Sequence, residues 1–182
     1  MERRLNPTAA SLLGFLHDGP RSGYELVAAA QHRIGDFWSL TQSQVYRELA
    51  WMAEAGLVTA GERGTRERRP YSLTDAGRAA FAGWIDRPPG PETIRHPLLL
   101  TVSFGRHVPP DRLASFLRQH REAHSERLRA YEAEAASHAG ASEPDPCADA
   151  TLAFGIAYER AVMAWFDDLP ASITNPQQPK PR

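Results

Sequence analysis

The stretch Thr41-Gln-Ser-Gln-Val-Tyr-Arg-Glu-Leu-Ala-Trp-Met-Ala-Glu-Ala-Gly56 predicts one helix whose two ends are both marked in the sequence. Thr41 can cap the first turn, and Gln44, three residues later, can reach back to complete a capping box. Gly56 supplies the left-handed residue with which many helices end. We therefore expect a helix with well-defined limits.

The predicted helix has one apolar face and one polar face. Val45, Leu49 and Met52 recur at intervals of four and three residues and form a stripe that should be buried. Amide, hydroxyl and guanidinium groups are the side-chain groups that contact base edges and phosphates in DNA. The candidate DNA contacts are Thr41, Gln42, Ser43, Gln44, Tyr46 and Arg47. Taken alone, this face is equally compatible with an ordinary solvated helix surface.

The whole chain has 182 residues, a hydrophobic share of 42% and a formal net charge of −1. Its length accommodates one domain or two small ones, and the near-neutral charge gives no global argument for nucleic acid. We expect a cytoplasmic protein, because no segment has the length of a membrane span and the N-terminus lacks the apolar segment of a secretory signal.

The first half of the chain predicts the order helix, helix, helix, hairpin, helix. One helix begins at Asn6-Pro7, and a second begins at Ser22, which forms a capping box with Glu25. A fourth helix begins after Thr74. This order is that of a winged helix-turn-helix, in which the third helix enters the major groove and the hairpin wing lies along the DNA backbone.

The hairpin is predicted from two β-favouring segments, 57–60 and 69–73, around a turn rich in glycine and arginine. Because proline cannot donate to a ladder, Pro70 should make the second strand the edge of a two-stranded ribbon. The turn at 62–69 holds four arginines and two glutamates. By itself this cluster is best explained as a solvated turn, but beside a polar helix it favours phosphate binding. The candidate phosphate contacts are Arg66, Arg68 and Arg69.

The second half predicts a helical domain that pairs with another copy of the chain. The expected winged-helix domain is 1–87, and the proline-rich segment 88–91 is the expected linker. A mainly α dimerisation domain should occupy 92–170, with a helical, buried segment at 92–106 and long helices at about 109–139 and 148–169. Apolar residues surround the last helix, which favours a four-helix interface in a homodimer. The tail, 171–182, should be disordered.

Several consecutive motifs resemble the PadR family of bacterial transcriptional regulators. They are Leu13-Gly-Phe-Leu16 with Gly19-Pro-Arg-Ser-Gly-Tyr-Glu-Leu26, then Gln44-Val-Tyr-Arg-Glu-Leu49, Glu54-Ala-Gly-Leu-Val58 and Arg69-Pro-Tyr-Ser-Leu-Thr-Asp-Ala-Gly-Arg78. They cover about the first half of the chain, and the helical second half resembles the longer-tailed branch of the family. The resemblance implies a dimer that binds an inverted repeat, and it permits a small phenolic or other flat hydrophobic effector.

Two other kinds of site have weak support in the sequence. His120 and His124 have the spacing of a zinc pair, but Arg121 stands where such motifs carry glutamate and no cysteine is near, so we expect no metal site. The single cysteine, Cys147, excludes an internal disulfide and lacks an activating neighbourhood. Phosphate-loop, nucleophile-elbow and dinucleotide motifs are absent, so we expect neither an enzyme nor a cofactor.

An effector pocket is the remaining hypothesis for the aromatic residues. Core packing is the simpler explanation, because aromatic side chains dominate protein cores generally. An apolar pocket at the domain joint or the dimer interface would use the same residues. The candidate lining residues are Trp38, Trp84, Phe104, Tyr158 and Trp165.

The sequence as a whole predicts a dimeric DNA-binding regulator, most simply a repressor released by a small aromatic ligand. Two alternatives remain. One is a winged-helix module that binds protein partners instead of DNA, which the near-neutral charge permits. The other is a small-molecule-binding domain centred on the aromatic second half.

Overall fold

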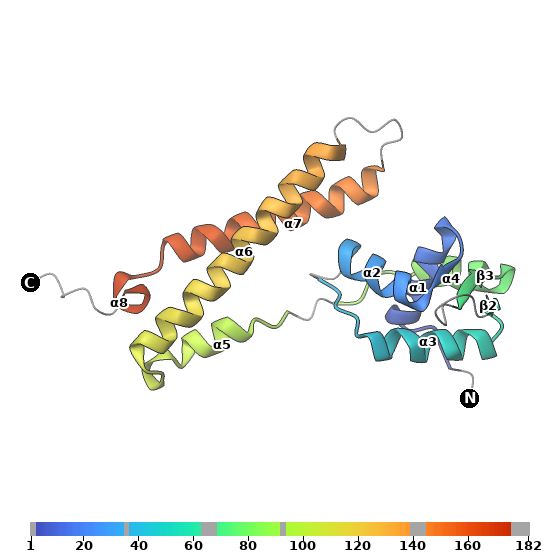
Figure 1. Cartoon of the computed structure of the whole chain (residues 1–182), viewed down its shortest axis with the longest axis horizontal. Coiled ribbons are helices and arrows are strands. Elements are labelled where there is room, and N and C mark those ends of the chain that lie inside the picture. The colour runs from blue at the N-terminus through green and yellow to red at the C-terminus, as the bar shows by residue number, and fades with distance from the viewer. Residues whose placement is uncertain (1–2, 35–36, 63–68, 92–93, 139–144, 176–182) are drawn as a thin grey trace, which may run out of the picture. The chain divides into compact units, whose positions relative to one another are not determined.

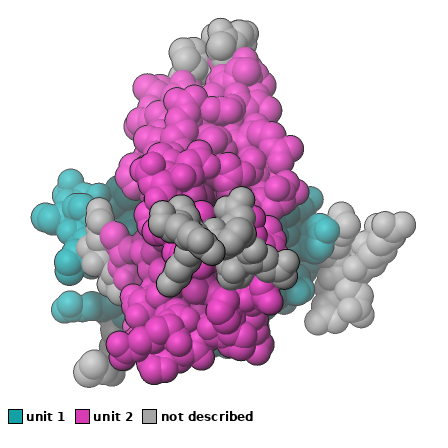
Figure 2. Space-filling model, turned by 90° about the vertical axis from the view of Figure 1, so that its left-hand side faces the viewer, with its two compact units in different colours: residues 1–91 teal, residues 92–182 magenta. Residues whose placement is uncertain are grey.

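The computed structural model describes residues 3–34, 37–62, 69–91, 94–138 and 145–175. The chain divides into two compact units, Met1–Pro91 (unit 1) and Glu92–Arg182 (unit 2), which are coloured separately in Figure 2. Both units are mainly helical, and a small sheet belongs to unit 1 (Figure 1). Within the described ranges, no helix is both long and apolar enough to cross a membrane.

Unit 1 contains the four predicted helices, and each begins at a capping residue that the sequence marks. Asn6 Oδ1 accepts a hydrogen bond of 2.8 Å from the amide of Ala9, and Ser22 and Thr41 each form the predicted capping box. The left-handed residue after the third helix is Gly56, with a φ of 71°. These predictions are confirmed. The helices are α1 (Pro7–Phe15), α2 (Gly23–Arg33), α3 (Gln42–Glu54) and α4 (Asp75–Ile85), with a 3-10 turn, η1 (Leu16–Asp18), after α1.

The core of unit 1 lies between α1, α2 and α3, with β2 and α4 beside it (Figure 1). The predicted stripe of α3 is its central part, because Val45, Leu49 and Met52 are fully buried. Each such side chain contributes roughly 1.5–3 kcal/mol when it leaves water. Its other fully or nearly fully buried members are Ala9, Leu12, Leu13, Leu16, Leu26, Ala30 and Val58.

The prediction of a two-stranded ribbon was wrong. The sheet has three antiparallel strands in the order β1-β3-β2, formed by β1 (Arg21–Ser22), β3 (Pro70–Leu73) and β2 (Val58–Ala60). The strand that begins with Pro70 is therefore central, not an edge. It tolerates proline because Pro70 is its first residue, while the Pro70 carbonyl still accepts a hydrogen bond of 2.8 Å from the Gly61 amide. Strand β1 has only two residues, so an alternating pattern of apolar and polar residues could not have predicted it from the sequence.

Unit 2 is built on two long helices, α6 (Pro110–His138) and α7 (Pro146–Asp167), which pack along one another (Figure 1). Both were predicted. Helix α7 begins two residues earlier than expected, because Asp145 Oδ1 accepts from the amides of Cys147 and Ala148 and so caps the helix. The small core contains Leu113, Leu117 and Phe166.

Two predictions for unit 2 were wrong. The segment 92–106 is not one buried helix: α5 (Pro97–Ser103) begins only at Pro97, and a 3-10 turn, η3 (Gly105–His107), follows it. Proline suits the first helical position, and in so short a helix only Leu98 and Val102 reach the core, so its other leucines stay exposed. The tail is not wholly irregular either, because α8 (Ala171–Thr174) forms and Ile173 packs on the core. Residues 176–182 lie outside the described residues.

Gly77 in α4 gives a direct test of how tightly unit 1 is packed. A Cβ atom at this position would overlap the carbonyl oxygen of Leu57 and lie 2.8 Å from Cδ1 of Leu73. Gly77→Ala should therefore lower the free energy of unfolding by roughly 1–3 kcal/mol, as overpacking does. Gly83→Ala is the matched control in the same helix, where an added Cβ meets nothing within 4 Å.

The control should gain about 0.5–1 kcal/mol from the better helix propensity of alanine. Urea unfolding of both variants would check the two signs. Equal effects at the two positions would contradict the close contact of α4 with the Leu57 carbonyl and the Leu73 side chain.

Candidate DNA-binding surface

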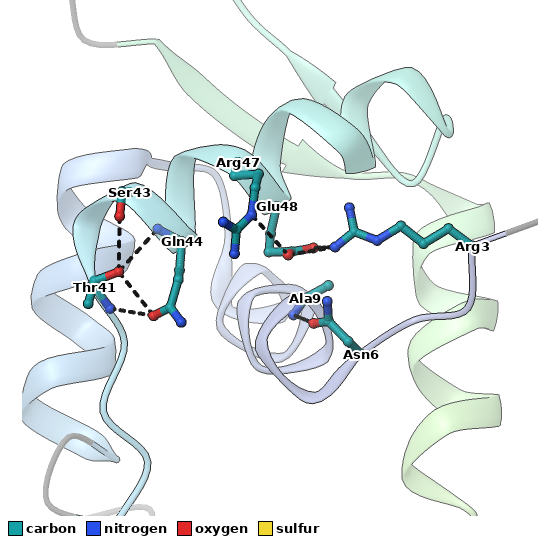
Figure 3. A network of polar contacts seen from close by, with 8 residues as sticks. All are labelled: Arg3, Asn6, Ala9, Thr41, Ser43, Gln44, Arg47 and Glu48. Atoms are coloured by element: carbon teal, nitrogen blue, oxygen red, sulfur yellow. Dashed lines mark hydrogen bonds and ion pairs between the residues drawn. The ribbon is translucent and has the colours of Figure 1, made fainter.

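The first turn of α3 is held by reciprocal hydrogen bonds between Thr41 and Gln44 (Figure 3). The Thr41 amide donates to Oε1 of Gln44 over 2.9 Å, and the Gln44 amide donates to Oγ1 of Thr41 over 3.3 Å. The Thr41 and Ser43 hydroxyl groups lie 3.1 Å apart. The capping box of Thr41 and Gln44 therefore fixes the direction in which the following side chains of α3 project.

The outward row of α3 contains Gln42, Ser43, Tyr46 and Arg47, all of them exposed. The Arg47 side chain is the most open of the charged groups here, at 66% exposed. The Tyr46 ring lies against the start of α2, where a Cβ added to Gly23 would be 2.5 Å from the ring atom Cε1. The absence of a side chain at Gly23 thus gives the ring its place on the surface.

Sequence reasoning missed a buried charge beside this row. Glu48 is 2% exposed, yet it lies in the register of the apolar stripe of α3. Arg3 donates from Nη2 to both carboxylate oxygens, over 2.6 and 2.7 Å, and its guanidinium lies 4.5 Å from the centre of the Trp51 ring. A buried acid needs a partner, so the position of Glu48 among apolar residues could have predicted an ion pair from the sequence. The sequence could not identify Arg3 as the partner, because 45 positions separate the two residues.

The base of the hairpin is closed by two contacts of Gly61. Its amide donates to the Pro70 carbonyl over 2.8 Å, and its own carbonyl accepts from Nε of Arg69 over 3.1 Å. Arg69 is an exposed residue. The other two candidate phosphate contacts, Arg66 and Arg68, lie outside the described residues.

The five aromatic residues of the hypothetical effector pocket are divided between the units. Trp38 is 42% exposed and Trp84 is half-buried, both in unit 1. In unit 2, Phe104 is 57% exposed, and Trp165 packs on the Phe166 ring with centroids 4.8 Å apart. The pocket stays a prediction that these positions do not test.

Tyr158, the fifth aromatic residue, stacks on His96 with ring centroids 6.2 Å apart. Burial raises the pKa of the Tyr158 phenol, the neighbouring negative charge of Glu159 raises it further, and Arg127 opposes this change. The phenol therefore stays protonated near neutral pH and can donate a hydrogen bond.

A groove of about 240 Å³ lies elsewhere in unit 2, lined by Ala135, His138, Asp149, Leu152, Ala153 and Ile156.

One histidine of the pair considered for zinc has a structural role in unit 2. His124 Nδ1 lies 2.5 Å from Oε2 of Glu159, and Arg127 donates from Nε to Oε1 of the same carboxylate over 2.9 Å. Glu159 is 2% exposed, so the Arg127 guanidinium offsets a buried charge on α7, and the His124 ring adds a second polar contact from α6. His120 is exposed, and the described residues contain no cluster of three metal-ligating side chains.

Family models match both halves of the chain. The model of the Transcriptional regulator PadR-like family matches residues 12–83, and the Virulence activator alpha C-term model matches residues 94–173. The negative transcriptional regulator PadR of Bacillus subtilis is 35% identical over 98 residues, which are 52% of this chain and 54% of that protein. In this match the chain thus spans about half the length of its relative.

Solved structures extend the likeness over both units. Bacillus subtilis PadR in complex with operator DNA has a TM-score of 0.74 at 23% identity, covering 91% of this chain and 97% of the other. The same regulator in complex with p-coumaric acid has a TM-score of 0.65 at 23% identity, with 94% and 98% covered. The Vibrio cholerae virulence activator AphA has a TM-score of 0.63 at 27% identity, with 88% and 94% covered.

The fold is therefore that of the winged-helix regulators with a C-terminal helical region. One family model matches most of unit 1, and the other matches most of unit 2. These matches occur in the order of the two units, so residues 12–83 carry a PadR-like family domain and residues 94–173 carry a domain of the Virulence activator alpha C-term type.

Proposed function

We propose that this protein is a DNA-binding transcriptional regulator that acts as a homodimer on an inverted-repeat operator. The observation that carries the proposal is the surface of α3, where a capped and core-anchored helix of a winged-helix unit presents Gln42, Ser43, Tyr46 and Arg47 to solvent. Such a helix fits the major groove, and these groups are suited to base edges and phosphates. We propose that the protein binds DNA without catalysing a reaction, and that it acts in the cytoplasm.

The proposed roles of the site residues differ along the helix and the wing. Arg47 and Gln42 are the proposed base readers, because a guanidinium can bind guanine and an amide can bind adenine. Thr41 and Gln44 shape the first turn, since the capping box engages both side chains. Ser43 and Tyr46 are proposed phosphate contacts on the helix, and Arg66, Arg68 and Arg69 grip the backbone from the wing.

Unit 2 supports the proposed dimer through its exposed apolar side chains. Leu99, Leu100, Phe104 and Phe154 are 43%, 64%, 57% and 66% exposed in the single chain. Several large apolar side chains exposed on one unit fit an interface, and a second copy of the same helices is the simplest complement. A twofold dimer would present two α3 helices to half-sites about one DNA turn, roughly 34–36 Å, apart.

Repression and release by a small aromatic effector are the finer part of the proposal. They are supported by the negative regulator of Bacillus subtilis to which the chain is similar, and which has been crystallised with p-coumaric acid. Trp38, Trp84, Phe104, Tyr158 and Trp165 remain the proposed pocket residues. No chemical conversion of the effector is needed for this role.

The test of the function is DNA binding measured by fluorescence anisotropy. Tight binding to DNA from the region upstream of the gene, resistant to nonspecific competitor and weakening steeply with salt, is the expected result. If the wing contacts phosphates, the double variant Arg68→Ala with Arg69→Ala should bind all duplexes more weakly. The slope of log K against log salt concentration should fall in magnitude by about 2, one for each lost phosphate contact. A slope equal to that of the unaltered protein would remove the wing from the interface.

If the unaltered protein binds neither that DNA nor a broad genomic pool at low salt, DNA binding is overturned. A winged-helix module for protein partners would then be the better reading of the near-neutral chain.

Arg47 should control which sequence is chosen. Arg47→Ala should cost about 1–3 kcal/mol on the preferred duplex and much less on unrelated DNA, because the lost contact is to a base. Competition binding against a set of single-base operator variants gives the measurement. A uniform loss on every duplex would reassign Arg47 to the DNA backbone.

The dimer should depend on the exposed apolar residues of unit 2. Leu100→Glu and Phe154→Glu should each shift the mass measured by light scattering toward the monomer, because a buried unpaired charge opposes association. Gln119→Glu, at an exposed polar position of α6, is the matched control and should leave the mass unchanged. A dimer that persists in both apolar variants would place the interface elsewhere.

A further inference from the structure

The buried carboxylate of Glu48 has two arginines within reach, on opposite sides of it (Figure 3). Arg3 is in direct contact, with Nη2 at 2.6 and 2.7 Å from the two oxygens. Arg47, the proposed base reader, has its Nε at 3.9 Å from Oε1, beyond hydrogen-bond distance. One buried negative charge is thus shared unequally between an arginine of the N-terminal segment and an arginine of α3.

Arg3 is placed to keep its stronger contact with the carboxylate. Its guanidinium lies over the Trp51 ring at 4.5 Å, an arrangement that orients the planar group and adds a cation–π attraction. The segment behind it is fixed at the start of α1, where Asn6 caps the helix through the amide of Ala9. Arg47 is held less closely, because its Nε lies 3.9 Å from Oε1 and its side chain is 66% exposed.

We infer that Arg3 is a positioning residue that keeps Arg47 available to DNA by satisfying Glu48. The inference rests on the proposed function. When Arg3 is lost, the buried carboxylate has no hydrogen-bonded cation, which is a costly state inside a protein. Arg47 needs to move its Nε only about 1 Å to come within hydrogen-bond distance of Glu48. Its guanidinium then turns back toward the core and leaves the surface of α3.

The test is a set of coupled substitutions read out as selectivity. The probes are a duplex that the unaltered protein selects from a random pool and a shuffled duplex of the same composition. The quantity measured is the ratio of the two Kd values. Arg3→Ala should reduce this ratio on the order of 10-fold, the share that one arginine contact to a base supplies.

Two double variants separate positioning from direct contact. In an Arg47→Ala background, Arg3→Ala should cause no further loss of the ratio, because the residue on which it acts is already gone. In a Glu48→Gln background, Arg3→Ala should also leave the ratio unchanged, because a neutral amide does not draw Arg47 inward. Additive losses in both backgrounds would overturn the inference, since Arg3 would then act on DNA by itself.

A matched control and a DNA-free measurement complete the design. Arg4→Ala removes the same charge from the neighbouring exposed residue and should leave the ratio unchanged. The Nε–Hε NMR signal of Arg47 should shift in Arg3→Ala and return to its original position in Arg3→Ala with Glu48→Gln. An unmoved signal would overturn the inference whatever the DNA result.

Folding is followed separately through the melting temperature. If Arg3→Ala is unfolded at the assay temperature, Arg3→Lys replaces it, because lysine keeps the charge but loses the stacked, forked geometry. Arg3→Lys should lower the ratio of the two Kd values by a smaller factor than Arg3→Ala. Adding Glu48→Gln should cancel that loss. A loss that persists with Glu48→Gln counts against the inference. An unaltered protein that selects no duplex would refute the proposed function, whereas one that selects a duplex but ignores Arg3 would refute only the inference.

Discussion

The burial of one stripe on α3 constrains the rest of unit 1. Val45, Leu49 and Met52 have no exposed surface, and they meet the apolar faces of α1 and α2. Truncating such a residue typically costs 2–5 kcal/mol, far more than most surface side chains contribute. The rotation of α3 about its axis is therefore set by the core, and the outward row follows from helical geometry. That row can vary in sequence without altering the fold that presents it.

Buried polar groups fix the contacts that apolar packing leaves adjustable. Ser22, Glu48 and Glu159 are the buried polar or charged residues of the described chain, and each is hydrogen-bonded. Apolar side chains can slide a little against one another at small energetic cost. A buried charge, by contrast, strongly destabilises the fold when its partner moves away. Glu48 thus ties the N-terminal segment to α3, and Glu159 ties α7 to α6. These two pairings set the alignment of the elements in each unit.

The two units differ in how completely they bury their own apolar residues. Unit 1 encloses a contiguous core of α1, α2, α3 and β2, whereas among the described residues of unit 2 the buried apolar cluster is small and is formed by Leu113, Leu117 and Phe166. Two long helices that pack against each other cover only one face of each other, so Phe154 on α7 stays exposed, and Leu100 on the short helix α5 is exposed as well. This incomplete core is the physical basis for proposing that a second copy of the chain completes unit 2.

The sequence by itself determined the elements whose signals are local. Capping boxes at Ser22 and Thr41, the glycine at 56 and the period of the α3 stripe depend on residues a few positions apart, so they could be recognised before folding was considered. The polar row at Gln42, Ser43 and Arg47 followed from the same period. With the hairpin signal, these features were sufficient to predict the winged helix and the candidate DNA-binding helix.

Only the tertiary structure decided the pairings between distant residues. It placed the strand of Pro70 in the centre of the sheet, because β1 joins it from a position far earlier in the chain. It also decided that Arg3 pairs with Glu48 and that His124 pairs with Glu159. Such contacts carry no local period or spacing, since they form only when packing brings separate segments together and a buried charge takes the partner within reach.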